Sequence, residues 1–230
     1  MSNTSIVIQH HDLMNTGAIQ PDNSSTTETS THQDNPITDE QFWQGFISSF
    51  DPCEFCKMIV YLLEEYGTAE ACNRFDVGNT IEFIIADVLK GCGFKVLELP
   101  NAKRFDIEIV NYKKLSIKYT NTGNIKLHNS NGCINKDIEI KDTILLTSDK
   151  LYLISNDLLC KNNIDINDYI KNTHDGLQLK RKLLTKLNKE NYRYMYDIDI
   201  SYNKTQCKNR LCSKTFFSKF KEEYALSLKQ

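Results

Sequence analysis

The sequence predicts an α/β fold with a central mixed sheet flanked by helices, and three observations carry this prediction. An amphipathic helical pattern covers residues 79–90. Two short segments that alternate apolar and polar residues follow at 105–109 and 115–119. Two apolar runs at 143–147 and 151–154 then have the composition of buried strands. Helices and strands that alternate along one chain predict a sheet covered by helices.

The chain divides into a tail and one domain. Residues 1–36 are rich in Ser, Thr, Asn and Gln and lack hydrophobic periodicity, so we expect them to be disordered. A single domain is expected over 37–230, a length that can bury a sizeable core. Within it we expect N-terminal helices at 37–75, a core at 76–200 and a basic C-terminal extension at 201–230.

Two helices are expected before the core. Thr38 precedes two acidic residues and can cap a helix that carries Phe42, Phe46 and Phe50 at helical spacing. A second amphipathic helix is expected at about 54–65.

The first helix of the core has both a start and a stop signal. The pattern over 79–90 begins with polar residues and ends before Gly91 and Gly93. Glu82 is expected in its first turn, and residues 97–99 are expected on the first strand.

The next two segments predict a hairpin with a polar face. Side chains alternate across a strand, so Asp106 and Glu108 share one face, and Ser116 and Lys118 share a face of the second strand. A tight connection at 111–114 sets Asp106 opposite Lys118. The same register sets Glu108 opposite Ser116.

This polar face is a candidate metal site. Two carboxylates at about 4 Å repel by about 4 kcal/mol at an effective dielectric near 20, and a divalent cation offsets that repulsion. Magnesium binds through one or two carboxylates and substrate phosphate oxygens, so Asp106 and Glu108 are candidate ligands for Mg²⁺. Lys118 would orient or deprotonate the attacking water, and Ser116 would donate a hydrogen bond.

These residues also carry a family resemblance. Asp106, the ten-residue step to Ser116 and the run Ser116-Ile117-Lys118 resemble the S-x-K variant of the PD-(D/E)XK nuclease motif. The nearest resemblance is to type II restriction endonucleases. It implies a restriction-endonuclease-like αβββαβ core, in which a helix carrying a glutamate precedes three strands and a further helix and strand follow. Glu82 would be that glutamate, and 37–230 would be a single nuclease domain.

The chain departs from this motif at two positions. No proline precedes Asp106, and Ser116 stands where the motif has its second acid. Glu108 can supply the missing carboxylate because it shares the face of Asp106. Glu82 can also supply it because the family helix packs beside the site, and the sequence leaves both open.

A polar tract at 119–132 follows the candidate lysine. Asn, Lys, Ser and Thr side chains can bond base edges or phosphates, and a similar stretch follows the lysine in some of these nucleases. An Asn/Gly-rich loop or hairpin is the alternative for this tract. The side chains that we expect to contact DNA are Thr120, Thr122, Asn124, Lys126, His128, Asn129 and Ser130.

Three elements are expected after the buried strands. Residues 175–189 have leucines at helical spacing with basic residues on the other face, which predicts a second core helix. Alternation at 194–200 predicts a further strand, and 213–228 has the pattern of a terminal helix.

Charge is distributed unevenly along the chain. Residues 1–56 hold eight acidic residues and no Lys or Arg, although the whole chain has a net charge of −2. Residues 171–230 hold 14 basic and 6 acidic residues. Such a basic segment suits phosphate binding, and a solvated lysine-rich surface is the alternative.

Composition favours a cytoplasmic protein. No apolar run is long enough for a membrane span, and the N-terminus has no secretory signal pattern. Eight cysteines in a chain of this class fit reduced thiols better than a disulfide framework. A four-thiolate zinc site is a less favoured possibility, with ligands Cys53, Cys56, Cys207 and Cys212.

The resemblance implies an Mg²⁺-dependent endonuclease that cuts double-stranded DNA at a short specific sequence. Cutting a palindrome needs two equivalent sites, so we expect a homodimer. A cognate DNA methyltransferase acting on the same sequence is a further implied partner. The alternatives are a structure-specific repair or recombination nuclease, a catalytically inactive DNA-binding module with a nuclease-like core, and an unrelated α/β protein with surface salt bridges.

Overall fold

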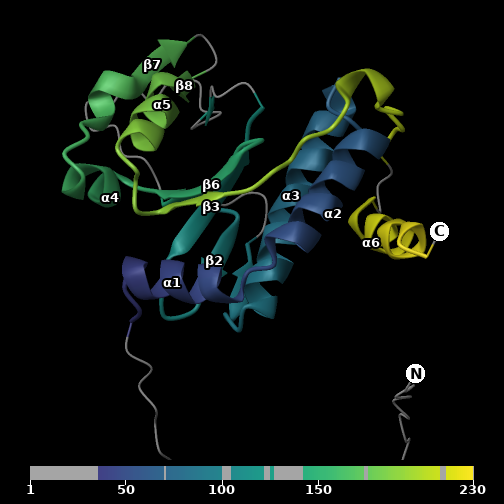
Figure 1. The fold of residues 1–230 in the computed structure, drawn as a ribbon, viewed down its shortest axis with the longest axis horizontal. Coiled ribbons are helices and arrows are strands. Elements are labelled where there is room, and N and C mark those ends of the chain that lie inside the picture. Colours follow the sequence, from purple (N-terminus) through teal and green to yellow (C-terminus); the bar gives the residue numbers. More distant parts are fainter. Residues whose placement is uncertain are drawn as a thin grey trace, which may run out of the picture. The chain divides into compact units, whose positions relative to one another are not determined.

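Helices and strands alternate along the part of the chain that the structure describes (Figure 1). This computed structural model describes residues 36–69, 71–99, 105–121, 125–126, 142–173, 176–212 and 216–229. The tail predicted at 1–36 therefore lies outside the described residues, except for Pro36.

The helices and strands have the following bounds. The helices are α1 (Asp39–Ser49), α2 (Pro52–Glu65), α3 (Ala71–Gly91), α4 (Asn156–Lys161), α5 (Lys182–Lys189) and α6 (Phe216–Ser227), with 3-10 turns η1 (Ile166–Tyr169) and η2 (Lys204–Gln206). The strands are β1 (Val96–Glu98), β2 (Ile107–Ile109), β3 (Lys114–Tyr119), β4 (Ile125–Lys126), β5 (Thr143–Leu146), β6 (Lys150–Ile154), β7 (Ile170–Thr173), β8 (Gly176–Leu179) and β9 (Met195–Asp197).

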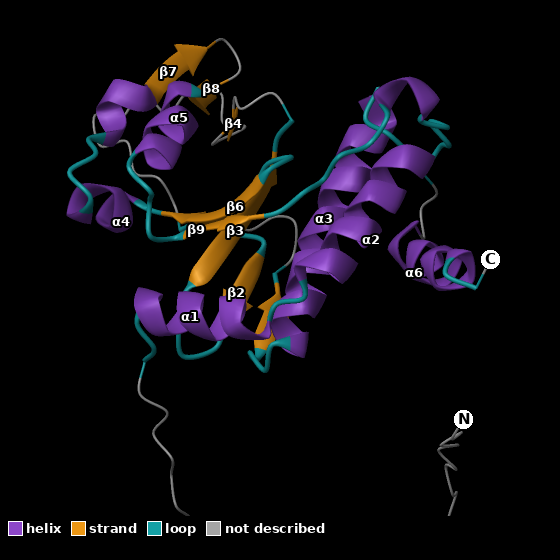
Figure 2. Cartoon of the chain, in the orientation of Figure 1, coloured by secondary structure: helices purple, strands orange, loops and turns teal. Residues whose placement is uncertain are grey.

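A six-stranded mixed sheet forms the centre of the fold (Figure 2). Its strand order is β1-β2-β3-β5-β6-β9, and β3 and β5 are its only parallel neighbours among the described strands. A separate three-stranded sheet has the order β4-β8-β7. The predicted α/β class, with a mixed sheet and flanking helices, is confirmed.

Helix α1 begins and packs as its sequence predicts. The Thr38 hydroxyl accepts a hydrogen bond from the Gln41 amide, and the Gln41 side chain accepts one from the Thr38 amide, which completes a capping box. Phe42 and Phe46 are buried, and the Phe42 ring stacks on Tyr112 at 4.4 Å between centroids. Phe50 is buried at the C-cap. This aromatic stack joins α1 to the turn that follows β2.

Helix α3 is longer than expected, and this moves Glu82. The helix begins at Ala71 instead of residue 79, so Glu82 lies in its middle and not in its first turn. Of the polar residues that suggested a start, Thr80 lies inside the helix, and its hydroxyl donates to the Asp76 backbone oxygen one turn earlier. Near the observed start, the Asn73 amide group donates to the backbone oxygens of Tyr66 and Arg210. The Arg210 contact comes from a distant segment, so the local pattern could not reveal it.

The β2–β3 hairpin has a different register from the predicted one. Ile107 lies opposite Leu115, and Glu108 lies opposite Lys114, a shift of two residues from the expected pairing. The shift follows from a shorter connection, which is closed by the bond from the Ile109 amide to the Lys113 oxygen, with Asn111 at a φ of 64°. A shift of two residues keeps every side chain on its own face, so the polar face survives.

The second half of the chain contains both confirmed and wrong predictions. The buried strands at 143–147 and 151–154 are confirmed as β5 and β6. The helix predicted at 175–189 is wrong in its first part, because β8 occupies the first residues and pairs with β7. Only α5, eight residues long, is helical there. Leucines two apart fit a strand as well as a helix, and pairing with β7 decided between them.

The last two predicted elements are both present, and residues 213–215 of the second lie outside the described residues. The strand predicted at 194–200 is limited to β9, and the terminal helix predicted at 213–228 is α6. Within the described ranges, no helix has both the length and the apolar composition of a membrane span.

Helices α1 and α3 lie beside the strands that carry the polar face (Figure 1). Helix α3 contacts β1 and β3, and α2 and α6 pack on α3. The α3 side of this contact is apolar, with Ile81, Ile84, Ile85 and Leu89 buried. Each fully buried side chain of this kind stabilises the fold by about 1.5–3 kcal/mol. The packing fixes the distance from Glu82 to strand β3.

Candidate active site

Asp106 lies at the centre of a hydrogen-bonded cluster on β3. Its Oδ2 atom accepts from the Ser116 hydroxyl at 3.0 Å and from the Ile117 amide at 2.6 Å. Lys118 Nζ lies 3.3 Å from the same oxygen. Asp106 immediately precedes β2, and its own amide donates to the Leu115 oxygen. The backbone ladder therefore fixes Asp106 beside β3.

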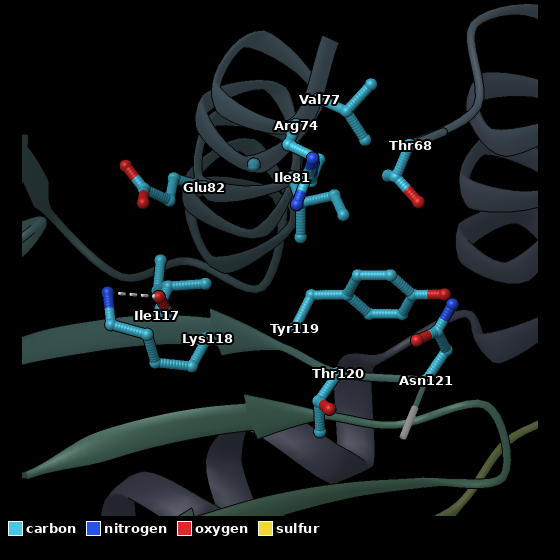
Figure 3. A pocket seen from close by; sticks show the side chains of 11 residues that line it. Thr68, Arg74, Val77, Ile81, Glu82, Ile117, Lys118, Tyr119, Thr120 and Asn121 are labelled. Atoms are coloured by element: carbon cyan, nitrogen blue, oxygen red, sulfur yellow. Dashed lines mark hydrogen bonds between the residues drawn. The ribbon is translucent and has the colours of Figure 1, made fainter. Parts of the chain in front are cut away.

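Lys118 is held in one orientation by two acceptors. Its ammonium group donates to the Ile117 carbonyl at 2.9 Å (Figure 3). It also donates to Asp106. Its side chain is 33% exposed, so the ammonium is partly buried but still reachable by a ligand. An amine held this way can donate to a phosphate oxygen or orient a water molecule.

Glu82 reaches the same site from α3. Figure 3 shows Glu82 and Lys118 on the same side of the pocket, one from the helix and one from the strand. Burial, and to a smaller extent the negative charge of Asp106, raise the pKa of Glu82 to about 7, while Lys118 lowers it. Within the described part of the chain, the Glu82 carboxylate makes no ion pair or hydrogen bond. Glu82 is thus a desolvated acid beside a second carboxylate.

The raised pKa of Glu82 predicts a pH-dependent stability. The folded protein binds this proton more tightly than the unfolded chain, whose value is 4.5, so the stabilisation is complete below pH 4.5 and is lost as the pH rises through about 7. We expect the free energy of unfolding to fall by about 2 kcal/mol over this range, relative to Glu82→Gln. Urea unfolding in EDTA at several pH values measures the difference, and parallel curves would contradict it.

Glu108 occupies a different position from the other acids. It lies opposite Lys114, and its Oε2 atom is 3.6 Å from Lys114 Nζ in an exposed ion pair. The predicted pairing of Glu108 with Ser116 is therefore wrong. Besides burial, the charges of Asp106 and Lys118 act on the pKa of Glu82, and that of Glu108 does not. Among the two acids that the sequence left open, Glu82 is the one that α3 brings toward Asp106.

The oxygen atoms of this site fit a magnesium ion. The three hydrogen bonds that the Asp106 carboxylate accepts all end on Oδ2. Among the described residues, Oδ1 accepts no hydrogen bond. Asp106 Oδ1, the Glu82 carboxylate and the Ile117 carbonyl would hold the ion, which keeps several waters in most protein sites. The described residues contain no group of three or more His, Cys, Asp or Glu side chains arranged for a metal. The ion would therefore depend on water and substrate oxygens as further ligands.

The predicted DNA-contacting tract is mostly outside the described residues. Thr122, Asn124, His128, Asn129 and Ser130 all fall there. Thr120 is buried beside the site, where its amide donates to the Leu146 oxygen. Lys126 belongs to β4, and only its backbone is described.

Sequence reasoning missed two parts of the site. The Ile117 backbone supplies both an amide and a carbonyl to the cluster, which no side-chain pattern signals. Arg74, two helical turns before Glu82, lines a pocket next to it. A spacing of eight residues on an extended α3 could have indicated Arg74, but the helix was predicted to start later.

None of the four cysteines considered for zinc forms a disulfide, and none belongs to a group of three or more His, Cys, Asp or Glu side chains placed for a metal within the described ranges.

No protein-family model, curated protein or solved structure matches this chain.

Proposed function

We propose that the protein is an Mg²⁺-dependent endonuclease that hydrolyses phosphodiester bonds of double-stranded DNA at a short specific sequence, as type II restriction enzymes do. It would act as a homodimer, because a palindromic sequence presents two equivalent bonds. The cluster of Asp106, Lys118 and Glu82 would be its active site.

The convergence of these three side chains is the observation that carries the proposal. Asp106 and Lys118 come from neighbouring strands and touch, while Glu82 comes from a helix 24 residues before Asp106 in the chain. An isolated surface salt bridge would account for Asp106 and Lys118 alone. It would not account for a desolvated acid directed at the same pair, because burying such a group is unfavourable without a partner.

Each group then has a chemical role. When bound, Mg²⁺ would supply positive charge at the scissile phosphate. Lys118 donates to a phosphate oxygen or orients the attacking water, and Ser116 fixes the Asp106 carboxylate. The attacking water gives up one proton to solvent as its oxygen bonds to phosphorus. The bond from phosphorus to the leaving oxygen breaks, and the leaving oxygen takes up a proton from solvent.

The order of elements around the site gives further support. Helix α3 with Glu82 precedes an antiparallel β1-β2-β3 unit, and β5 is parallel to β3. This is the order expected for an αβββαβ core up to its third strand. The helix predicted as the second of this core corresponds in part to α5, which follows β5 and β6 in the chain.

Digestion of DNA of known sequence tests the proposal. We expect discrete fragments when Mg²⁺ is present and none when EDTA replaces it. Mapping the fragment ends gives the recognised sequence and the cut position. Preference for branched or damaged DNA would instead favour a structure-specific nuclease, and binding without cutting would favour an inactive DNA-binding module.

A further inference from the structure

A pocket of about 320 Å³ extends from the candidate active site along α3. Glu82 and Lys118 line one part of it, and Arg74 lines another, together with Thr68 and Asn121. Figure 3 shows Arg74 projecting from α3 toward the strand that carries Tyr119. We call this the Arg74 pocket. Its volume lies at the lower end of the range of about 300–1,000 Å³ that small-ligand sites occupy.

Arg74 brings a positive charge to the pocket. Among the described residues, its guanidinium has no ion pair or hydrogen bond, and the residue is exposed. Eight residues separate Arg74 from Glu82, so their positions on α3 differ by about 12 Å along the helix axis. A guanidinium is well suited to bind phosphate oxygens in a bidentate manner. Arg74 therefore offers a cationic contact for a phosphate group in the same pocket as Lys118.

The wall of the pocket next to Arg74 is apolar. Val77 and Ile81 from α3 and the ring of Tyr119 from β3 contribute to it. Aromatic and aliphatic surfaces bind the flat faces of bases and the carbon edge of a sugar. A phosphate-binding cation above an apolar wall matches the two chemical parts of a nucleotide.

Gly78 leaves open space in the wall of this pocket. It lies within α3 and lines the pocket, and a Cβ atom added to it would meet no atom within 4 Å. Packing therefore does not require glycine here. Glycine is unfavourable inside a helix, so a larger residue would favour α3, but it would also fill part of the pocket. Glycine at this position keeps that space open for a bound group.

We propose that the Arg74 pocket binds one nucleotide of the DNA strand beside the scissile phosphate, with Arg74 on its phosphate group and Gly78 leaving room for it. This inference rests on the proposed function, because it takes DNA as the substrate. It assigns Arg74 and Gly78 to substrate binding and not to the chemical step.

The test measures binding of a short fluorescent DNA duplex of mixed sequence by the full chain with Ca²⁺ in place of Mg²⁺. Gly78→Leu fills the pocket and is expected to weaken binding about tenfold or more, although leucine favours the helix. Arg74→Met is expected to lower the slope of log affinity against log salt by about 0.9 between about 50 and 200 mM KCl.

Two control variants show whether these effects belong to the pocket. Gly91→Leu makes the same change at the other end of α3, about 20 Å away, where an added Cβ also meets no atom within 4 Å. Arg193→Met removes an exposed arginine that pairs with Glu40. Both should bind DNA as the unaltered protein does, and thermal unfolding should show that all four variants are folded.

The outcomes separate this inference from the proposed function. Unchanged binding and salt slope in Gly78→Leu and Arg74→Met would overturn the assignment of the pocket, whether or not the protein cuts DNA. Weakened binding in both variants, without cleavage by the unaltered protein, would support the assignment of the pocket and contradict the proposed nuclease activity. Failure of the unaltered protein to bind DNA would overturn both.

Discussion

Replacing Asp106 by asparagine is expected to lower the rate of Mg²⁺-dependent DNA cleavage by at least about 10³-fold. The change removes the negative charge that would hold the ion, while the amide oxygen can still accept from the Ile117 amide. The free energy of unfolding should therefore fall by only about 1 kcal/mol, the contribution of one altered hydrogen bond. Single-turnover cleavage and urea unfolding measure the two effects separately.

Glu108→Gln is the matched control for this substitution. Glu108 is an acid on β2, two residues after Asp106, with an exposed partner in Lys114. Its loss should change cleavage less than about threefold, because exposed ion pairs contribute little. Full cleavage activity in Asp106→Asn would contradict the proposed active site. Equal losses in both variants would show that Glu108 also belongs to it.

Replacing Lys118 by methionine is expected to reduce cleavage by about 10²–10⁴-fold, the usual contribution of a positioned acid–base or charge-stabilising group. Methionine keeps most of the length and the apolar stem of lysine. It loses the bonds to the Ile117 carbonyl and to Asp106. DNA binding should change little, since many other contacts to phosphates would remain.

Lys114→Met provides the comparison for Lys118. Both lysines are on β3, but Lys114 lies at the start of the strand, and its side chain is 50% exposed beside Glu108. We expect nearly full cleavage by this variant. A loss of binding in Lys118→Met as large as its loss of cleavage would assign Lys118 to DNA affinity alone, which would contradict its proposed role in the chemical step.

Patterns that depend on neighbours in the chain were predicted well. The capping box at Thr38 and the apolar strands β5 and β6 follow from local hydrogen bonding and side-chain alternation. The alternation on β3 placed Ser116 and Lys118 on one face, and this survived an error in the hairpin register. The register error was two residues, an even number. It therefore changed which residues lie opposite each other, but not the face of the sheet on which each side chain lies.

Other local patterns were ambiguous and were predicted poorly. The start of α3 was placed too late because Thr80 suggested a polar helix start, whereas its hydroxyl bonds to the Asp76 oxygen inside the helix. Residues 176–179 form a strand because they pair with β7, which ends nearby at Thr173. The spacing of the leucines alone did not reveal this pairing.

The sequence by itself determined the α/β class and the side chains that could carry the chemistry, because alternation and helical periodicity act over a few residues. The tertiary structure alone decided which acid accompanies Asp106. Packing of α3 against β1 and β3 brings Glu82 to the site, whereas the hairpin register pairs Glu108 with Lys114. Distances between elements depend on packing across the whole core, which no short stretch of sequence specifies.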